Sequence, residues 1–312
     1  MFVGIDVGGT NLKAGLVDET GQILEVERTP LCFQGPEAFV RTLAELTRTV
    51  AGRFGVDPQT LEGVGVGLPG AVDEGEVLFT TNIPMEHLPL EPLFRRELDL
   101  PLRLGNDADC AAAAEYLCGA GRGTLDFAVV TLGTGVGVGL VIDGTLRSGI
   151  ASSEGGHMVT HQGGRSCSCG GQGCWEQYAS ATGLILRTEA AMAQHPESLL
   201  HRIAAEEGGV EGRTAFQAAQ MGDETALRVC GDYVEDLAAG VLSLVNLLRP
   251  EVLALGGGVA AAPEELLLQP LRRTVEERSF SRHGGRVTRI LPAQMGNDAG
   301  VIGAALLHRL EG

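Results

Sequence analysis

The sequence predicts an α/β protein whose two halves begin in the same way. Short apolar runs of strand length alternate with longer amphipathic segments, an order typical of mixed sheets covered by helices. The run IDVGGT at residues 5–10 is answered by VTLGTG at residues 130–135, and GLVD at 15–18 by GLVID at 139–143. Both copies are predicted as strand, glycine-rich hairpin, strand and polar turn, which indicates an internal duplication.

The length of 312 residues allows two ordinary domains. We expect an N-terminal α/β domain over residues 1–120 and a C-terminal α/β domain over residues 121–298. A final helix within residues 299–312 is expected to pack back on the first domain, and Asp298 is expected to cap its start.

The individual elements follow from hydrophobic spacing and turn residues. In the first half, we expect strands at residues 2–7, 12–17, 23–28 and 64–68, and helices at residues 36–53 and 108–118. The stretch around Pro84, Pro89 and Pro92 is expected to be irregular. In the second half, we expect strands at residues 127–132, 136–142, 252–255 and 287–291, and helices at residues 224–248, from 263 onward and at 299–310.

Composition limits the classes of function. Hydrophobic residues make up 44% of the chain, enough for a large core, and the net charge of −17 argues against a nucleic-acid surface. No apolar stretch approaches the length of a membrane span, and the first residues do not resemble a signal peptide. Lys13 is the only lysine, which excludes the Gly-Lys-Ser/Thr phosphate loop and the lysine-dependent protein-kinase site. We therefore expect a cytoplasmic protein without nucleic-acid or membrane partners.

One short stretch holds most of the metal-ligating side chains. His157, Cys167, Cys169 and Cys174 form a Cys3His set, which has the ligand number and type of a tetrahedral zinc site. A disulfide loop or an unrelated group of buried thiols is the alternative. The odd number of cysteines suits a reducing compartment and favours the metal. Because four protein ligands close the site, the zinc is expected to be structural.

Three glycine-rich turns follow predicted strands. The first is Asp6-Val7-Gly8-Gly9-Thr10, the second Gly133-Thr134-Gly135 and the third Gly256-Gly257-Gly258. Such turns let backbone N–H groups approach a phosphate closely and form an anion-binding nest. Each alone is also typical of an ordinary turn. Two hairpins together predict a grip on a polyphosphate that needs no lysine, and the third turn could flank a nucleotide base.

Asn106 and Asp107 precede the alanine-rich helix. Taken alone, this pair is typical of a helix cap. Phosphoryl transfer to an alcohol also needs a carboxylate that accepts the hydroxyl proton and a site that holds magnesium near the phosphates. Asp107 has the chemistry for the first role, and Asp6 has the chemistry for the second, through magnesium and water.

In these motifs the chain resembles the ROK family of sugar kinases and repressors, and within it the bacterial glucokinases. The matching motifs occur in family order over nearly the whole chain: Asp6 to Thr10, LPGAVD at 68–73, Asn106-Asp107-Ala108, LGTG at 132–135, Glu154-Gly-Gly-His157, CSCGGQGCWE at 167–176 and LGGG at 255–258. The zinc motif, with its leading Glu-x-Gly-His, is the most specific of these.

The resemblance implies an actin-like (hexokinase/Hsp70-type) fold with two domains around a cleft. It implies ATP-dependent phosphorylation of the 6-hydroxyl of a hexose, with glucose as the first choice, and it makes Asp107 the general base. The sugar hydroxyls would be read by Asn82, Asn106, Asp107, Glu154, His157 and Glu176. The nucleotide and its Mg²⁺ would be bound by Asp6, Gly8, Gly9, Thr10, Lys13, Gly133, Thr134, Gly135, Gly256, Gly257 and Gly258. His157 would bind Zn²⁺ through one ring nitrogen and face the sugar with the other. The family commonly forms homodimers or homotetramers.

Three alternatives stay open. The run NIPMEHL at 82–88 lacks the aromatic residue that family glucokinases usually carry after the equivalent of Asn82, so N-acetylglucosamine, N-acetylmannosamine, mannose or fructose could be the substrate. A sugar-responsive repressor would need a DNA-binding domain before the first motif, which begins here at residue 6 of an acidic chain. A zinc-stabilised scaffold without catalysis would leave Asp107 and the paired hairpins unexplained.

Overall fold

The computed structural model describes residues 1–80 and 83–310. The described chain forms two compact units. The first unit holds the residues up to Val129, the segment Gly139–Ser153 and the C-terminal segment from Gln294, and the second holds Val130–Val138 and Glu154–Ala293. The chain therefore passes from one unit to the other more than once.

The first unit is built on a five-stranded sheet with the order β3-β2-β1-β4-β8. Its strands are β1 (Phe2–Val7), β2 (Asn11–Val17), β3 (Ile23–Pro30), β4 (Gly63–Leu68) and β8 (Leu102–Asn106). The first three strands are antiparallel to one another, whereas β4 pairs parallel with β1 and with β8. The expected meander is confirmed, and so is the buried strand at 64–68.

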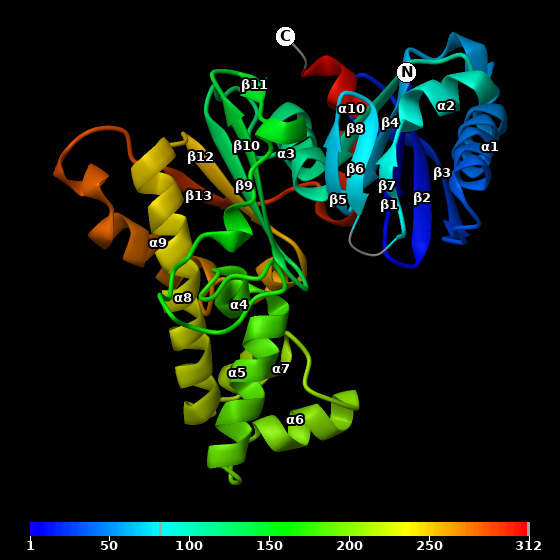
Figure 1. Cartoon of the computed structure of the whole chain (residues 1–312). Coiled ribbons are helices and arrows are strands. Elements are labelled where there is room, and N and C mark those ends of the chain that lie inside the picture. The colour runs from blue at the N-terminus through cyan, green and yellow to red at the C-terminus, as the bar shows by residue number, and fades with distance from the viewer. Residues whose placement is uncertain (81–82, 311–312) are drawn as a thin grey trace. The chain divides into compact units, whose positions relative to one another are not determined.

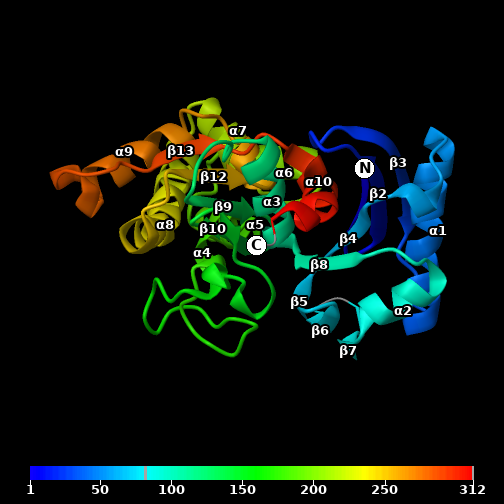
Figure 2. The ribbon, with the colours of Figure 1, turned by 90° about the horizontal axis from the view of Figure 1, so that it is seen from above.

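Helices pack on both faces of this sheet (Figures 1 and 2). They are α1 (Pro36–Phe54) and α2 (Leu90–Glu97) on one face, and α3 (Asp107–Cys118) and α10 (Ala299–Leu306) on the other. Side chains of β1 alternate between the faces. Ile5 shares a core cluster with Phe39 of α1, while Phe2 shares another with Ile302 of α10. The C-terminal helix therefore packs on the sheet that contains the first strand.

The described residues around Pro84, Pro89 and Pro92 are mostly in regular elements, so the expectation of an irregular region is wrong except at residues 83–85. A three-stranded sheet with the order β5-β6-β7 comprises β5 (Gly70–Asp73), β6 (Glu76–Thr80) and β7 (Glu86–Leu88). Pro89 is the N-cap residue of α2, and Pro92 lies in its first turn, where a proline costs no helical hydrogen bond. The short 3-10 helix η1 (Pro58–Thr60) precedes β4. Asn82 lies outside the described residues.

The second five-stranded sheet has the order β11-β10-β9-β12-β13. Its strands are β9 (Phe127–Leu132), β10 (Val136–Ile142), β11 (Thr145–Leu146), β12 (Val252–Gly256) and β13 (Arg289–Pro292). In chain order this is third, second, first, fourth, fifth, which is also the order of the first sheet. The similar openings of the two halves thus occupy corresponding places in two similar sheets.

The helices of the second unit are α4 (Glu176–Ala179), α5 (Ala181–Gln194), α6 (Leu200–Glu207), α7 (Thr214–Gln220), α8 (Glu224–Leu248) and α9 (Leu268–Arg278). Four of them, α4, α5, α7 and α9, pack against the long helix α8, and α6 packs against α7 and α5 (Figure 1). Short 3-10 helices of this unit are η3 (Gly155–His157), η4 (Gly258–Ala261) and η5 (Phe280–His283), whereas η2 (Gly149–Ala151) belongs to the first unit. Helix α8 has the predicted bounds, because Asp223 caps its start by accepting a hydrogen bond from the Ala226 N–H and Arg249 ends it in a left-handed conformation.

One expected helix start is wrong, whereas the final helix begins at Ala299 as expected but without a capping hydrogen bond from the Asp298 side chain. The helix expected from residue 263 begins at Leu268, because the preceding residues form turns and Leu267 has a non-helical conformation. Asp298 does not cap α10 through its side chain. Its carboxylate instead pairs with the Lys13 ammonium group. Helix α10 ends at Leu306 and continues as the 3-10 helix η7 (Leu307–Arg309), while the 3-10 helix η6 (Gly296–Asp298) precedes it. In the part of the chain that the structure describes, no helix combines the length and apolar character needed to cross a bilayer.

Candidate active site

In the first unit, the charge of one carboxylate, Asp6, raises the pKa of another, Asp107. Asp107 is the first residue of α3, and Asp6 lies near the end of β1. Asp107 is exposed to solvent, yet desolvation by the protein around its carboxyl group and the negative charge of Asp6 raise its pKa to about 6. Burial also raises the pKa of Asp6, although Lys13 opposes this effect. A pKa of about 6 leaves Asp107 ionised at neutral pH and able to accept a proton.

Helix α10 limits the position of the Asp6 carboxylate. A Cβ atom at Gly300, in the first turn of α10, would lie 2.7 Å from Cγ of Asp6. Any larger residue at this position would therefore require the Asp6 carboxylate to shift. Lys13 lies opposite Asp6 in the β1–β2 pair. Its ammonium group contacts Asp298 and donates to the carbonyl oxygen of Asn297 at 3.1 Å, so in this structure it ties β2 to the start of α10.

The hairpin between β1 and β2 contains Gly8, Gly9 and Thr10. The N–H group of Gly8 donates to the carbonyl oxygen of Asn11 at 2.9 Å, and this bond closes the hairpin. Gly9 and Thr10 are exposed. The hairpin therefore presents its tip to solvent, as a backbone phosphate site requires.

The second glycine hairpin is held by the helices that follow the cysteine-rich loop. The N–H group of Ala181 donates to the carbonyl oxygen of Gly133 at 2.8 Å. The hydroxyl group of Thr182 donates to the carbonyl oxygen of Thr134 at 2.8 Å. Oε2 of Glu176 accepts a hydrogen bond from the Val136 N–H at 3.1 Å. A Cβ atom on Gly135 would lie 2.2 Å from that oxygen. The predicted phosphate hairpin and the predicted sugar-reading carboxylate are therefore in direct contact.

His157, Cys167, Cys169 and Cys174 come together as the sequence predicts. The four potential ligand atoms lie within 4.8 Å of one another. Nδ1 of His157 is 3.6 Å from Sγ of Cys167, and Sγ of Cys169 is 3.6 Å from Sγ of Cys174. In a tetrahedral zinc site with standard bond lengths, neighbouring ligand atoms are about 3.6 to 3.8 Å apart. These two distances match that range, and the four side chains could hold a zinc ion.

The ionisation of the thiols also suits a metal. Burial opposes ionisation of Cys167, but the Cys169 N–H group and the neighbouring thiols outweigh it and lower the pKa of Cys167 to about 6. Burial and the other two thiols raise the pKa of Cys174 to about 12. Three thiols this close cannot all ionise without a compensating positive charge, and a divalent cation supplies one.

His157 presents its two ring nitrogens to different partners. Nδ1 faces the thiols, while Nε2 lies 4.0 Å from Oε2 of Glu154. A metal on Nδ1 would leave the proton on Nε2, on the side of the ring that faces Glu154, at a separation longer than a hydrogen bond. The Glu154 side chain is 71% exposed and can accept bonds from a ligand. The imidazole of His157 therefore lies between the cysteine cluster and the exposed carboxylate of Glu154.

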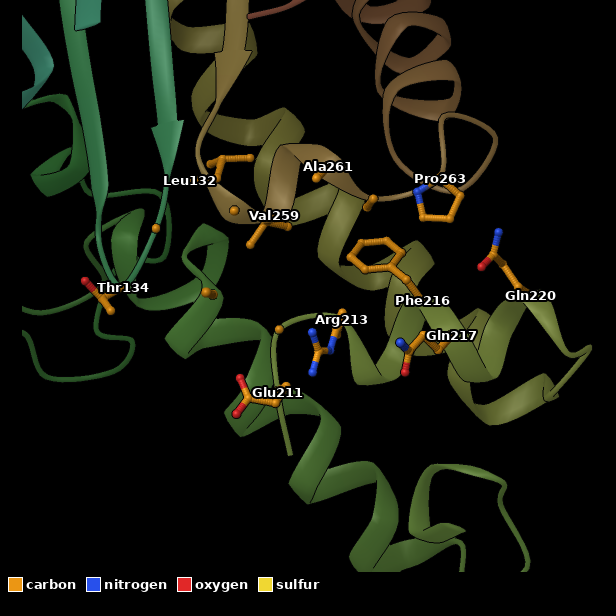
Figure 3. Close-up of a pocket in the computed structure, with 15 residues that line it drawn as sticks. Leu132, Thr134, Glu211, Arg213, Phe216, Gln217, Gln220, Val259, Ala261 and Pro263 are labelled. Atoms are coloured by element: carbon orange, nitrogen blue, oxygen red, sulfur yellow. The ribbon is translucent and has the colours of Figure 1, made fainter. Parts of the chain in front are cut away.

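A cavity of about 610 Å³ opens beside the second hairpin (Figure 3). Leu132, Gly133, Thr134 and Gly258 line it together with residues of α7 and η4. Its lining is mainly apolar, with the polar side chains of Glu211, Arg213, Gln217 and Gln220 at separate points. This volume and lining are typical of a small-molecule site. The structure therefore brings two of the three predicted glycine turns to one cavity.

The predicted site residues are divided between the units. Asp6, the hairpin at 8–10, Lys13, Asn106 and Asp107 lie in the first unit, whereas the hairpin at 133–135, Glu154, His157, Glu176, the thiols and the turn at 256–258 lie in the second.

Sequence reasoning missed the cavity residues Arg213, Phe216, Gln217 and Gln220. They come from helical segments far from the glycine motifs, and no local pattern marks them. It also missed Ser152, whose hydroxyl group bonds to Asn106.

Comparison with known proteins identifies the family of the chain that carries this site. The ROK family model matches residues 2–311. The chain is 34% identical to a glucokinase of Streptomyces coelicolor, over 99% of this chain and 98% of the relative. The crystal structure of a ROK family glucokinase from Streptomyces griseus, in complex with glucose and AMPPNP, superposes with a TM-score of 0.79 at 35% identity, covering 99% of each chain. The ROK hexokinase from Thermus thermophilus superposes with a TM-score of 0.79 at 32% identity, covering 98% of this chain and 96% of that one. The chain belongs to the ROK family.

Proposed function

We propose that this protein is an ATP-dependent hexose kinase that converts glucose to glucose 6-phosphate. The observation that carries the proposal is the carboxyl group of Asp107, whose pKa is raised to about 6 at the start of a helix in a chain of ROK glucokinase sequence. The glucokinase relatives match almost the full length of the chain. A ROK regulator without catalysis is therefore less favoured.

The reaction assigned to Asp107 is general-base catalysis. Its ionised carboxylate accepts the proton of the sugar 6-hydroxyl group as the oxygen attacks the γ-phosphorus of ATP. The bond between that phosphorus and the β,γ-bridging oxygen breaks, and ADP leaves with the bridging oxygen. A carboxyl group with a pKa of about 6 is a stronger base than an ordinary aspartate and is still ionised at pH 7.

The donor is assigned to the cavity of the second unit. Its mainly apolar lining and its volume of about 610 Å³ suit a nucleoside better than a bare polyphosphate chain. The hairpins at 8–10 and 133–135 are assigned to the phosphates, and the turn at 256–258 to the adenosine. Magnesium, held near Asp6 through water, would neutralise charge on the phosphates.

Zinc is assigned to His157, Cys167, Cys169 and Cys174 as a structural ion. Its role would be to fix the orientation and the tautomer of His157 and thereby to hold Glu154 for the sugar. Asn82, Asn106, Glu154, His157 and Glu176 are proposed to read the sugar hydroxyls. The domain division near residue 120, closure of two domains over the substrates and assembly into homodimers or homotetramers stay predictions.

The experiment is a phosphorylation assay of the purified protein with ATP and a panel of hexoses. The panel contains glucose, mannose, fructose, N-acetylglucosamine and N-acetylmannosamine. The proposal predicts the highest kcat/KM with glucose. A higher value with another hexose would keep the kinase reaction and replace the substrate. Failure to phosphorylate any of them would contradict the proposed function.

A further inference from the structure

The start of α3 is closed by a ring of three hydrogen bonds. Oδ1 of Asn106 accepts from the backbone N–H group of Asp109 at 2.7 Å. Nδ2 of Asn106 donates to Oγ of Ser152 at 2.8 Å, and the Ser152 hydroxyl group donates to Oδ1 of Asp109 at 2.8 Å. The ring therefore runs from Asn106 through Ser152 to Asp109 and back. Asp107 lies within the turn that this ring spans.

Each of the three residues supplies hydrogen-bonding groups that the ring requires. Asp109 is fully buried, and a buried carboxylate needs donors to remain in place. Ser152 supplies one such donor, to Oδ1, through a hydroxyl group that also accepts from Asn106, which an alanine could not do. Asn106 uses one lone pair of Oδ1 and one hydrogen of Nδ2 within the ring.

We propose that Ser152 and Asp109 are positioning residues that hold the Asn106 amide group and the Asp107 carboxylate in their working orientation. The proposal rests on the proposed function of Asp107 as general base. The ring fixes which way the Asn106 amide group faces, because Oδ1 must point to the Asp109 N–H and Nδ2 to Ser152. Without the Ser152 hydroxyl group, the Asn106 amide group would keep the bond from the Asp109 N–H but lose the anchor of its Nδ2.

Ser152 is itself held by the segment that precedes it. The N–H group of Ile150 donates to Oδ1 of Asp73 at 3.3 Å, so the 3-10 helix η2 is attached to the end of β5. Ser152 also lies two residues before Glu154 in the chain. One short segment thus fixes the start of α3 and leads directly into the Glu154-Gly-Gly-His157 motif.

The experiment compares four substitutions with the wild type: Ser152→Ala, Ser152→Thr, Ser152→Cys and the matched control Ser153→Ala. The last removes the same hydroxyl group one residue outside the ring. We expect kcat for hexose phosphorylation to fall between about tenfold and a hundredfold in Ser152→Ala, as for a misplaced catalytic group. The KM for ATP should stay unchanged. Threonine keeps both hydrogen bonds and should restore kcat to within about threefold, while cysteine, a weak donor, should be intermediate.

A loss of stability alone would not produce this pattern. Thermal unfolding and AMPPNP binding establish the folded fraction of each variant, and kcat is expressed per folded molecule. An unchanged kcat in Ser152→Ala, an equal loss in Ser153→Ala or no rescue by threonine would each overturn the proposal. If Ser152→Ala does not fold, the threonine and cysteine variants still give the order of kcat that decides the question.

Hydrogen exchange separates this proposal from the proposed function. The backbone N–H group of Asp109 should exchange at least about tenfold faster in Ser152→Ala than in Ser153→Ala, since its acceptor Asn106 loses an anchor. This readout does not depend on turnover. A wild type that phosphorylates no hexose would contradict the kinase function alone, whereas equal exchange in the two variants would overturn the positioning role.

Discussion

Lowering the pH from 7 to 5 should reduce kcat/KM for the sugar about tenfold, because Asp107 must be ionised to accept the hydroxyl proton. The carboxyl group has a pKa of about 6, raised by burial and by the charge of Asp6. The protonated form cannot act as a base, so activity is present above this pKa and is lost as the pH falls through it. We therefore expect kcat/KM for the sugar to decrease on the acidic side of the pH profile.

The magnitude follows from the fraction of Asp107 that is ionised. With a pKa of about 6, roughly 90% of the group is ionised at pH 7 and roughly 10% at pH 5. An aspartate with an ordinary pKa of about 3.9 would still be roughly 90% ionised at pH 5. The raised pKa therefore predicts a decrease of kcat/KM between pH 7 and pH 5 that an aspartate with an ordinary pKa would not cause.

The assay is direct measurement of sugar phosphate in quenched reactions at saturating magnesium and ATP, between pH 4.5 and 8. Circular dichroism at each pH verifies that the protein stays folded. The substitution Asp6→Asn removes the like charge beside Asp107 and should move this decrease to lower pH, whatever it does to the absolute rate. A flat profile between pH 7 and 5, or a decrease that Asp6→Asn does not move, would refute the assignment to Asp107.

The remaining predictions concern the base, the metal cluster and the second hairpin. Asp107→Asn should lower kcat by about 10² to 10⁴ while calorimetry still detects sugar binding; retained turnover would remove Asp107 as the base. Because the folded state raises the pKa of this carboxyl group, the same change should raise the thermal midpoint at pH 7 and have little effect near about pH 3, where the carboxyl group is largely protonated in both the folded and the unfolded state. Cys169→Ser should reduce bound zinc, measured by mass spectrometry, and raise the KM for sugar; zinc loss without a change in that KM would contradict the orienting role. Gly135→Ala should displace Glu176 and raise the KM for sugar at least about tenfold, whereas Gly231→Ala, in open space on α8, should leave it unchanged.

Much of the fold was predictable where local signals agree with the final structure. The β1–β2 and β9–β10 hairpins follow from alternating apolar residues around glycines, and α8 follows from its spacing between Asp223 and Pro250. The β5–β6–β7 sheet was missed because Pro84 and Pro89 suggested an irregular chain. Pro89 in fact occupies a helix start, where proline is tolerated.

The site was predictable where chemistry is local in the sequence. The four residues of the Cys3His set are close together in the chain, and their types alone indicate a metal. The cavity was not predictable in this way, because Phe216 and Gln217 reach it from α7 while Gly133 reaches it from a distant hairpin. The hydrogen bond between Ser152 and Asp109 was missed for the same reason, since it joins residues 43 positions apart.

Phosphorus NMR of a reaction that contains the purified protein, glucose and MgATP tests the central claim most directly. We expect glucose 6-phosphate and ADP in equal amounts with the wild type, and formation of sugar phosphate at least about a hundredfold slower with Asp107→Asn. If a folded wild-type protein that binds glucose gives no sugar phosphate, the kinase account is contradicted. If Asp107→Asn forms glucose 6-phosphate at the wild-type rate, the general-base mechanism is wrong.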